Sequence, residues 1–281
     1  MTILEVIQRS AQFLEKKGVE SPRLQGELLL AHALRMPRMN LYLNYGRGLS
    51  DAETEAFRAL VRRRGAREPL QYIVGSTSFC GLEIGVTPSV LIPRPETEML
   101  AELAWTFLKG LPDGRALDLC TGSGCLAIAL AAKAPAARIC ATDISPDAVA
   151  VARQNAERCK VAERIEFRAG DGFAAVNSQD KFNLIVSNPP YIPSAAIAGL
   201  EAEVREFEPR MALDGGEDGL DFYRRIAAEA PAFLSPGGRL MVEVEEDGAE
   251  ATRALFEEAG WPSPALEKDH NGKARILIAD R

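Results

Sequence analysis

Histidine is scarce in this sequence, where only His32 and His270 occur, far apart along the chain. A histidine-rich metal site is therefore not expected, and no metal ion is predicted. The cysteines include no C-x-x-C pair and are odd in number, which fits neither a zinc ribbon nor a disulfide framework; they are Cys80, Cys120, Cys125, Cys140 and Cys159. No stretch approaches the ~20 apolar residues that span a bilayer. We expect a protein of a reducing, cytoplasmic compartment without a membrane partner.

An excess of positive charge is also missing. The 33 Lys and Arg residues stand against 40 Asp and Glu residues, which gives a net charge of −7, whereas proteins that bind duplex phosphate are usually basic. The balance differs along the chain, since residues 1–70 carry 12 basic and 8 acidic residues and the remainder carries 21 and 32. General nucleic-acid binding is therefore not expected, and the two parts should meet different surfaces.

Three segments with different patterns divide the 281 residues. Residues 1–70 place apolar side chains at helical spacing and predict a small helical bundle. Within them, Ser50 and Glu53 form a capping-box pattern that marks the start of one helix. Residues 71–92 form short extended runs broken by glycine and predict a hairpin linker. Residues 93–281 alternate strands with helices and should form the larger domain.

The alternation after residue 93 predicts an α/β fold, a doubly wound, Rossmann-like sheet with mostly parallel strands. Strands are expected at residues 116–120, 138–142, 165–168, 182–187, 239–244, 265–268 and 275–279. The last two can form an antiparallel pair. Together with the helical bundle, this sheet makes one large and one small domain.

The first of these strands runs into a turn of small residues directly before an apolar helix. Gly122 and Gly124 let the backbone turn sharply and lie against a ligand at the carboxyl end of the sheet. The next strand ends at Asp143, whose carboxylate can accept hydrogen bonds from both ribose hydroxyls. The combination predicts an adenosine-containing cofactor and leaves NAD and S-adenosylmethionine open. Asp118 favours S-adenosylmethionine, because a carboxylate beside the loop can face a cationic methionine end, although it can equally cap nearby amides.

A Gly-Asp-Gly sequence follows the third strand. In this architecture such a loop lies beside the adenine, so Asp171 can accept a hydrogen bond from the adenine amino group while Gly172 and Phe173 flank the ring. The same sequence is also typical of an ordinary turn.

The strongest signal is Asn188-Pro189-Pro190-Tyr191, which follows a buried strand. Two prolines fix φ and remove two amide donors, so the loop is rigid and offers acceptors in fixed places. A planar substrate NH2 can donate one hydrogen to the Asn188 side-chain oxygen and the other to the Pro189 carbonyl, while Tyr191 supplies a flat wall. Such acceptors push electron density onto a poorly nucleophilic nitrogen and align it with an activated methyl group. No strong base is needed, and the substrate can be an amide or an exocyclic amine.

Four motifs together resemble the HemK/PrmC family of peptide chain release factor glutamine methyltransferases. They are Asn188-Pro189-Pro190-Tyr191, the loop at 118–124, and the segments 91–98 and 207–210. The resemblance extends over essentially the whole chain. It implies a class I methyltransferase sheet, with S-adenosylmethionine as cofactor and S-adenosylhomocysteine as product. It further implies methylation of the side-chain N5 of the glutamine in the release factors' Gly-Gly-Gln motif, with the N-terminal domain helping to engage the release factor.

The chemistry of the residues and the resemblance together define a candidate site. The cofactor-binding residues are Asp118, Cys120, Thr121, Gly122, Ser123, Gly124, Asp143, Asp171, Gly172 and Asn188. The catalytic and substrate-binding residues are Asn188, Pro189, Pro190 and Tyr191. Cys120 departs from the family pattern, which more often has glycine there, and its Cβ narrows the approach of the backbone to the cofactor. The acidic segment 242–248 is assigned no role.

Two other substrates remain open within the same chemistry. A related enzyme with the same tetrapeptide methylates a glutamine of a ribosomal protein, and an adenine N6 can enter the same clamp on a base flipped out of its stack. The acidic catalytic part argues against a nucleic-acid substrate. An NAD-dependent oxidoreductase fits poorly, because the tetrapeptide offers no proton donor for hydride chemistry.

Overall fold

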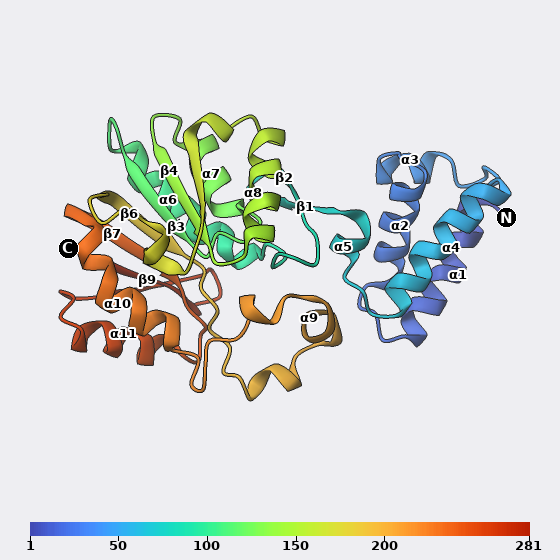
Figure 1. Ribbon diagram of the computed structural model, residues 1–281. Helices are drawn as coiled ribbons and strands as arrows, with labels where there is room; N and C mark the ends of the chain where they lie inside the picture. The colour runs from blue at the N-terminus through green and yellow to red at the C-terminus, as the bar shows by residue number, and fades with distance from the viewer. The chain divides into compact units, whose positions relative to one another are not determined.

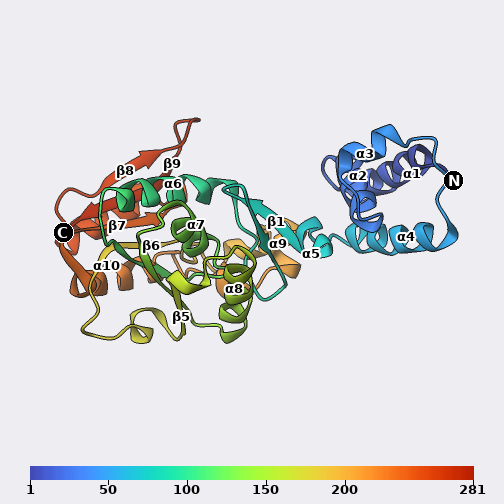
Figure 2. The ribbon, with the colours of Figure 1, turned by 90° about the horizontal axis from the view of Figure 1, so that it is seen from above.

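The computed structural model describes residues Met1–Arg281 and divides them into two compact units. One unit comprises Met1–Ser76 with Glu201–Phe207, and the other comprises Thr77–Leu200 with Glu208–Arg281. Their helices and strands can be followed in two views (Figures 1 and 2). None of the helices combines the length and apolar character that a membrane span requires. All five cysteines are free.

The helical unit consists of short helices around one apolar core. Its helices are α1 (Ile3–Lys16), α2 (Pro22–Ala33), α3 (Arg38–Leu43), α4 (Asp51–Gly65), α5 (Leu70–Val74) and α9 (Ala202–Phe207). Helix α4 begins with a capping box between Ser50 and Glu53, so the predicted start of this helix is confirmed. The core contains the fully buried side chains of Ile3, Leu14, Leu29, Leu30 and Leu41.

The segment predicted as extended from residue 71 begins with a helix instead. Helix α5 spans Leu70–Val74, between Pro69 at its N-cap and Gly75, which has φ 86° at the C-cap. A proline before a helix and a left-handed glycine after it are boundary signals, and the frequent glycines of this segment concealed them. The hairpin follows as β1 (Ser76–Phe79) and β2 (Leu82–Gly85).

The other unit contains a seven-stranded sheet in the order β5-β4-β3-β6-β7-β9-β8. The strands are β3 (Arg115–Leu119), β4 (Arg138–Asp143), β5 (Ile165–Ala169), β6 (Phe182–Ser187), β7 (Leu234–Glu243), β8 (Ala265–Lys268) and β9 (Ala274–Asp280). All neighbouring strands are parallel except β9, which is antiparallel to β7 and β8. The predicted doubly wound, mostly parallel sheet with an antiparallel end is confirmed.

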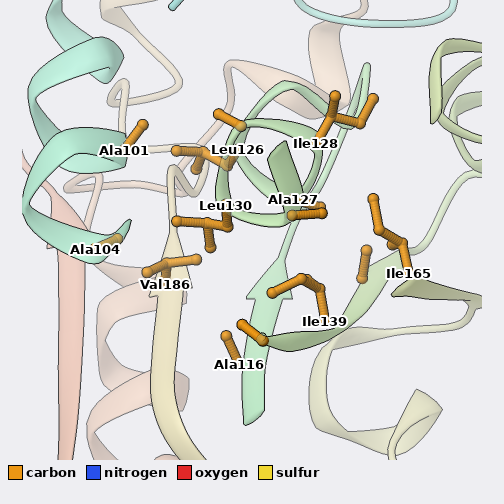
Figure 3. Packing of buried hydrophobic residues seen from close by; sticks show 14 of the residues in the cluster. Ala101, Ala104, Ala116, Leu126, Ala127, Ile128, Leu130, Ile139, Ile165 and Val186 are labelled. Atoms are coloured by element: carbon orange, nitrogen blue, oxygen red, sulfur yellow. The ribbon is translucent and has the colours of Figure 1, made fainter. Parts of the chain in front are cut away.

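Helices cover both faces of this sheet (Figure 1). They are α6 (Pro95–Lys109), α7 (Cys125–Lys133) and α8 (Pro146–Arg158) on one face, and α10 (Asp221–Phe233) and α11 (Ala249–Glu258) on the other. Short 3-10 helices are η1 (Ala162–Arg164), η2 (Gly172–Ala175), η3 (Ala196–Gly199) and η4 (Arg210–Ala212). Figure 3 shows Leu126 and Leu130 of α7 above Ala116 and Val186 of the sheet. Because both faces are buried, the central strands are mainly apolar, although β3 contains the buried Asp118.

The turn between β3 and α7 holds a non-glycine residue in the left-handed region. Cys120 has φ 60°, and Gly122 and Gly124 have φ 53° and 81°. Glycine adopts this backbone without a steric penalty, whereas a Cβ at such a φ is strained. The family pattern more often has glycine at the position of Cys120, and the backbone strain there gives a physical reason for that preference.

The strain at Cys120 leads to a testable prediction. Cys120→Gly should be less destabilising than Cys159→Gly by about 1–2 kcal/mol, because only the first substitution relieves a left-handed Cβ. Cys159 is a matched control, since it is also a partly buried free cysteine but has φ −82°. Chemical denaturation of the two variants measures the difference. Equal losses of stability would contradict a strained backbone at Cys120.

A partly buried ion cluster joins α9 to the helices of its own unit. Glu203 accepts hydrogen bonds from Arg64 at 2.6 Å and from Arg67 at 2.7 Å. The Arg64 side chain is only 5% exposed. Burial by itself raises the pKa of Glu203, but the hydrogen bonds from Arg67 and Arg64 hold it below its ordinary value. The carboxylate is therefore the stable form of Glu203 in the folded unit.

Glu203→Gln should lower the free energy of unfolding by about 2–3 kcal/mol at neutral pH, because Arg64 then stays buried without a carboxylate. A carboxyl whose folded-state pKa is lowered adds stability above its unfolded pKa. The wild-type advantage should therefore persist at neutral pH and shrink as the pH falls below about 4.5. Calorimetric unfolding at several pH values checks this dependence.

Helix α9 also provides the control for this prediction. Glu206 forms an exposed ion pair with Arg205, so Glu206→Gln should change the stability by less than about 0.5 kcal/mol at any pH. A similar loss in both variants would show that the ion cluster has no special role.

Candidate functional site

Three adjacent strands end together at the candidate site. Leu119 at the end of β3 lies beside Thr142 of β4 and Ser187 of β6, so the turns that follow the three strands meet at one edge of the sheet. A cavity opens there, with about 660 Å³ of empty space including its open mouth. The predicted site residues that line it are Cys120, Gly122, Asp143, Asp171, Gly172, Asn188 and Pro190.

The other predicted residues lie behind or beside the cavity lining; they are Asp118, Thr121, Ser123, Gly124, Pro189 and Tyr191. Asp118 is fully buried, and its Oδ2 accepts hydrogen bonds from the Thr121 hydroxyl at 2.7 Å and the Ala127 amide at 3.1 Å. These are the capping contacts that the sequence left open. Its Oδ1 is buried without a partner, and burial raises the pKa of Asp118 to about 7. Asp118 thus stabilises the turn after β3 through Oδ2, while its Oδ1 accepts no hydrogen bond.

Asp143 connects the end of β4 to the turn after β3. Its Oδ2 accepts a hydrogen bond from the Gly122 amide at 2.8 Å, and its Oδ1 accepts one from the Ser145 amide at 2.9 Å. Burial raises the pKa of this carboxyl. Each oxygen keeps a further lone pair, so Asp143 can still accept hydrogen bonds from two ribose hydroxyls in the cavity that it lines.

The adenine side differs from the sequence prediction. Phe173 is 4% exposed and stacks on Phe233 in the apolar core, with 4.9 Å between the ring centroids, so the prediction that it flanks the adenine was wrong. Phe222 of α10 lines the cavity instead. Asp171 accepts a hydrogen bond from Arg225 Nη1 at 2.8 Å. No local motif marks Phe222, because only the folding of α10 against the sheet brings it to the cavity.

Neither of the two acceptors that were predicted for a planar NH2 has a hydrogen-bonding partner in the chain. Asn188 Nδ2 donates to Thr97 Oγ1 at 3.1 Å, which leaves Asn188 Oδ1 free to accept. The Pro189 carbonyl accepts no backbone or side-chain hydrogen bond from the chain. The two acceptors belong to consecutive residues, so one planar group can contact both.

A glycine-rich loop holds the backbone that follows the two prolines. Ile192 forms a β-bridge with Asp214, and the Gly215 amide donates to the Ile192 carbonyl at 2.9 Å. A Cβ at Gly215 would lie 2.7 Å from the Cα of Tyr191. Because that distance is too short for a real contact, glycine is needed for this close approach. The loop therefore supports the clamp from behind.

Two sequence motifs that had no firm role meet beside the cavity. Arg94 Nη2 donates to Glu208 Oε1 at 2.7 Å, and the Glu208 side chain is 2% exposed. Burial raises the pKa of Glu208, and Arg94 opposes that shift. Their neighbours Leu91 and Pro209 line the cavity. The ion pair joins two parts of the wall that stand 114 positions apart in the sequence.

Asn155 is a supporting residue that sequence reasoning missed. It is 1% exposed. Its Oδ1 accepts a hydrogen bond from the Gly85 amide at 2.8 Å, and its Nδ2 donates to the carbonyls of Gly85 and Ser123, each at 2.9 Å. Asn155 thereby ties the β1–β2 hairpin to the cofactor turn. A single asparagine inside a helix carries no local signal, since its partners are 70 and 32 positions away.

The residues present fit S-adenosylmethionine. Asp143 offers a carboxylate for the ribose, and an added Cβ at Gly122 would meet no atom within 4 Å, so the backbone there is open to a ligand. Asp118 does not line the cavity; it holds the turn through its contacts with Thr121 and Ala127. Leu91, Ile144 and Phe222 supply apolar wall for the adenine and the methionine chain.

Comparisons with known proteins show which families and folds the chain matches. Residues 5–75 match the PrmC N-terminal domain, and residues 97–201 match the methyltransferase small domain. The solved structures of a methyltransferase from Pyrococcus furiosus and of the T. thermophilus 16S rRNA N2 G1207 methyltransferase in complex with AdoMet and guanosine share the fold. The first has TM-score 0.50 and 21% identity over 81% of this chain and 98% of that chain. The second has TM-score 0.54 and 20% identity, and the match covers 73% of this chain and 49% of that chain.

Full-length relatives are much more similar. The release factor glutamine methyltransferase of Geobacter sulfurreducens is 47% identical over 98% of this chain and 95% of its own length. The release factor glutamine methyltransferase of Moorella thermoacetica is 40% identical over 100% of this chain and 99% of its own length. With this identity over both domains and a sheet edge that suits the cofactor, the chain is an S-adenosylmethionine-dependent methyltransferase and belongs to the release factor glutamine methyltransferase family.

Proposed function

We propose that this chain transfers a methyl group from S-adenosylmethionine to the side-chain N5 of the glutamine in the Gly-Gly-Gln motif of peptide chain release factors. The observation that supports this most is the pair of free acceptors, Asn188 Oδ1 and the Pro189 carbonyl, beside the cofactor cavity. A primary amide carries two hydrogens on one nitrogen and matches these two acceptors. A cytoplasmic location is part of the proposal, because release factors act in translation termination.

Bound S-adenosylmethionine supplies an electrophilic methyl group on a sulfonium sulfur. Asp143 and Gly122 line the cavity, so Asp143 would bind the ribose hydroxyls and the turn at Gly122 would lie along the ligand. Asn188 and the Pro189 carbonyl accept both amide hydrogens and fix the plane of the amide, so its nitrogen faces the methyl group. As the C–N bond forms and the methyl–sulfur bond breaks, positive charge develops on this nitrogen and strengthens both hydrogen bonds. The clamp therefore binds the transition state more tightly than the ground state. One of the two amide hydrogens then leaves as a proton to solvent, so the products are the N5-methylated amide and S-adenosylhomocysteine.

The methyl-transfer reaction gives the first test of this proposal. Purified protein with labelled S-adenosylmethionine should label a release factor and should leave a ribosomal protein and DNA unlabelled. Asn188→Ala should lower kcat by about a hundredfold, because it removes one of the two acceptors, while the cofactor affinity stays within about threefold. Label incorporation and isothermal titration measure the two effects.

Asn183, near the start of the same strand, provides the control. Its Oδ1 accepts a hydrogen bond from the Arg115 amide, away from the cavity, so Asn183→Ala should leave kcat within about twofold of the wild type. Label in DNA and not in a release factor would overturn the proposed substrate. Lost cofactor binding with normal turnover at saturation in Asn188→Ala would show that the clamp is misplaced.

We further propose that the N-terminal domain, residues 1–70, docks the release factor. This part of the chain carries more basic than acidic residues, whereas the rest is acidic. Between α1 and α4 it has a groove with Val6, Phe57 and Val61 among its lining residues, and with Arg9 and Arg62 beside them. Apolar surface flanked by arginines suits a protein segment with apolar and acidic side chains.

Charge reversal in this groove should separate docking from chemistry. Arg9→Glu with Arg62→Glu should lower kcat/KM for a whole release factor by about tenfold and leave kcat/KM for a short Gly-Gly-Gln peptide unchanged. The control, Lys16→Glu with Lys17→Glu, makes the same charge change on exposed positions outside the groove. Equal losses in the two double variants, or a matching loss with the peptide, would rule out docking by the groove.

A further inference from the structure

A buried carboxylate lies beside the clamp and has no part in the mechanism so far. Glu243, at the end of β7, is 3% exposed and belongs to the acidic segment that was assigned no role. Its Oε1 accepts a hydrogen bond from the Tyr191 hydroxyl at 3.4 Å, and its Oε2 is buried without a partner. Burial raises the pKa of Glu243 to about 7, and the Thr97 and Tyr191 hydroxyls oppose that shift.

Thr97 connects this carboxylate to Asn188. Thr97 is the third residue of α6 and is 2% exposed, and its Oγ1 accepts the hydrogen bond from Asn188 Nδ2. A hydroxyl has a single hydrogen to donate. Because the Thr97 oxygen receives the Asn188 hydrogen, its own hydrogen is left for another acceptor. Glu243 Oε2 is a buried acceptor without a partner, and the Thr97 hydroxyl is close enough to lower the pKa of Glu243, so this oxygen can take that hydrogen.

We propose that Glu243 and Thr97 are positioning residues that determine which end of the Asn188 amide faces the substrate. The Thr97 and Tyr191 hydroxyls favour the ionised form of Glu243, and in that form the carboxylate only accepts hydrogen bonds, so it directs the Thr97 hydroxyl toward itself. Thr97 can then only accept from Asn188, which turns Nδ2 inward and Oδ1 toward the substrate. With the opposite orientation, Asn188 would present NH2 to the substrate NH2, and two donors would face each other. The same carboxylate accepts from Tyr191 and holds the wall of the clamp.

The contacts that hold Glu243 in the fold are made by its backbone rather than by its carboxyl group. Tyr223, which is 1% exposed, donates to the backbone carbonyl of Glu243 at 2.7 Å, and the residue pairs with Ile276 of β9. Substitution of the side chain leaves both contacts in place. A role in positioning can therefore be separated experimentally from a role in folding.

The first experiment compares the rate with the stability. Thr97→Val and Glu243→Met keep the size of each side chain and remove its hydrogen-bonding groups, so each should lower kcat about tenfold or more, with cofactor affinity within about threefold. Thr97→Ser should recover most of the lost rate, and Glu243→Gln, which keeps one acceptor, should lie between. Glu243→Met should unfold at the same temperature as the wild type or a higher one, because it removes a poorly paired buried acid.

A buried threonine elsewhere gives the matched control. Thr252 of α11 is 1% exposed, and its hydroxyl donates to the Gly248 carbonyl at 2.9 Å. Thr252→Val should lower the stability and leave kcat unchanged. If Thr97→Val keeps the wild-type kcat, or if Glu243→Met is slow only in proportion to lost stability, the positioning role is overturned.

The second experiment needs no turnover, so it separates this inference from the proposed function on which its rate effect rests. The side-chain amide signals of Asn188 in the cofactor-free protein are assigned by their loss in Asn188→Ala. Their hydrogens should exchange slowly with water in the wild type and Thr97→Ser, and at least about tenfold faster in Thr97→Val and Glu243→Met. Unchanged exchange in both variants overturns the inference. The expected exchange pattern without methylation of a release factor supports the inference and overturns only the proposed substrate.

Discussion

The candidate site depends on three parallel strands, β4, β3 and β6, that end side by side. Leu119 pairs with Thr142 on one side and Ser187 on the other, and the Ser187 hydroxyl donates to the Leu119 carbonyl at 2.8 Å. A slip of one residue would turn each strand's side chains to the opposite face. Helices such as α7 cover those faces with apolar contacts (Figure 3), so core packing maintains the register. The same packing brings Asn188 beside the cofactor turn.

Buried acids are distributed in a way that separates the site from the rest of the chain. Asp118, Glu208 and Glu243 each have a buried carboxylate oxygen without a partner, and burial raises the pKa of all three. Such groups oppose folding. In the helical unit, by contrast, buried Glu27 accepts hydrogen bonds from Arg23, Arg38 and Tyr42. Buried acids with an unsatisfied oxygen are typical of functional sites.

Local motifs made part of the site predictable. The turn at Gly122, the ribose carboxylate of Asp143 and the tetrapeptide that begins at Asn188 are each contiguous with a strand, so their chemistry follows directly from the sequence. Thr97 and Glu243 were not found in the same way, because their roles come from contacts between α6, β6 and β7. The doubly wound sheet was predictable for a similar reason, since its alternating pattern extends over many residues, whereas five-residue α5 leaves a weak trace.

The two prolines explain why the clamp requires support from outside its own segment. They fix the backbone around Asn188 but not the rotation of its side-chain amide. The oxygen and nitrogen of an amide have almost the same size, so packing alone selects poorly between the two orientations. Only the direction of the hydrogen bonds distinguishes the two orientations. That direction has to be set by a group that cannot both donate and accept hydrogen bonds. A carboxylate accepts and never donates, so a buried glutamate suits this task although it destabilises the fold.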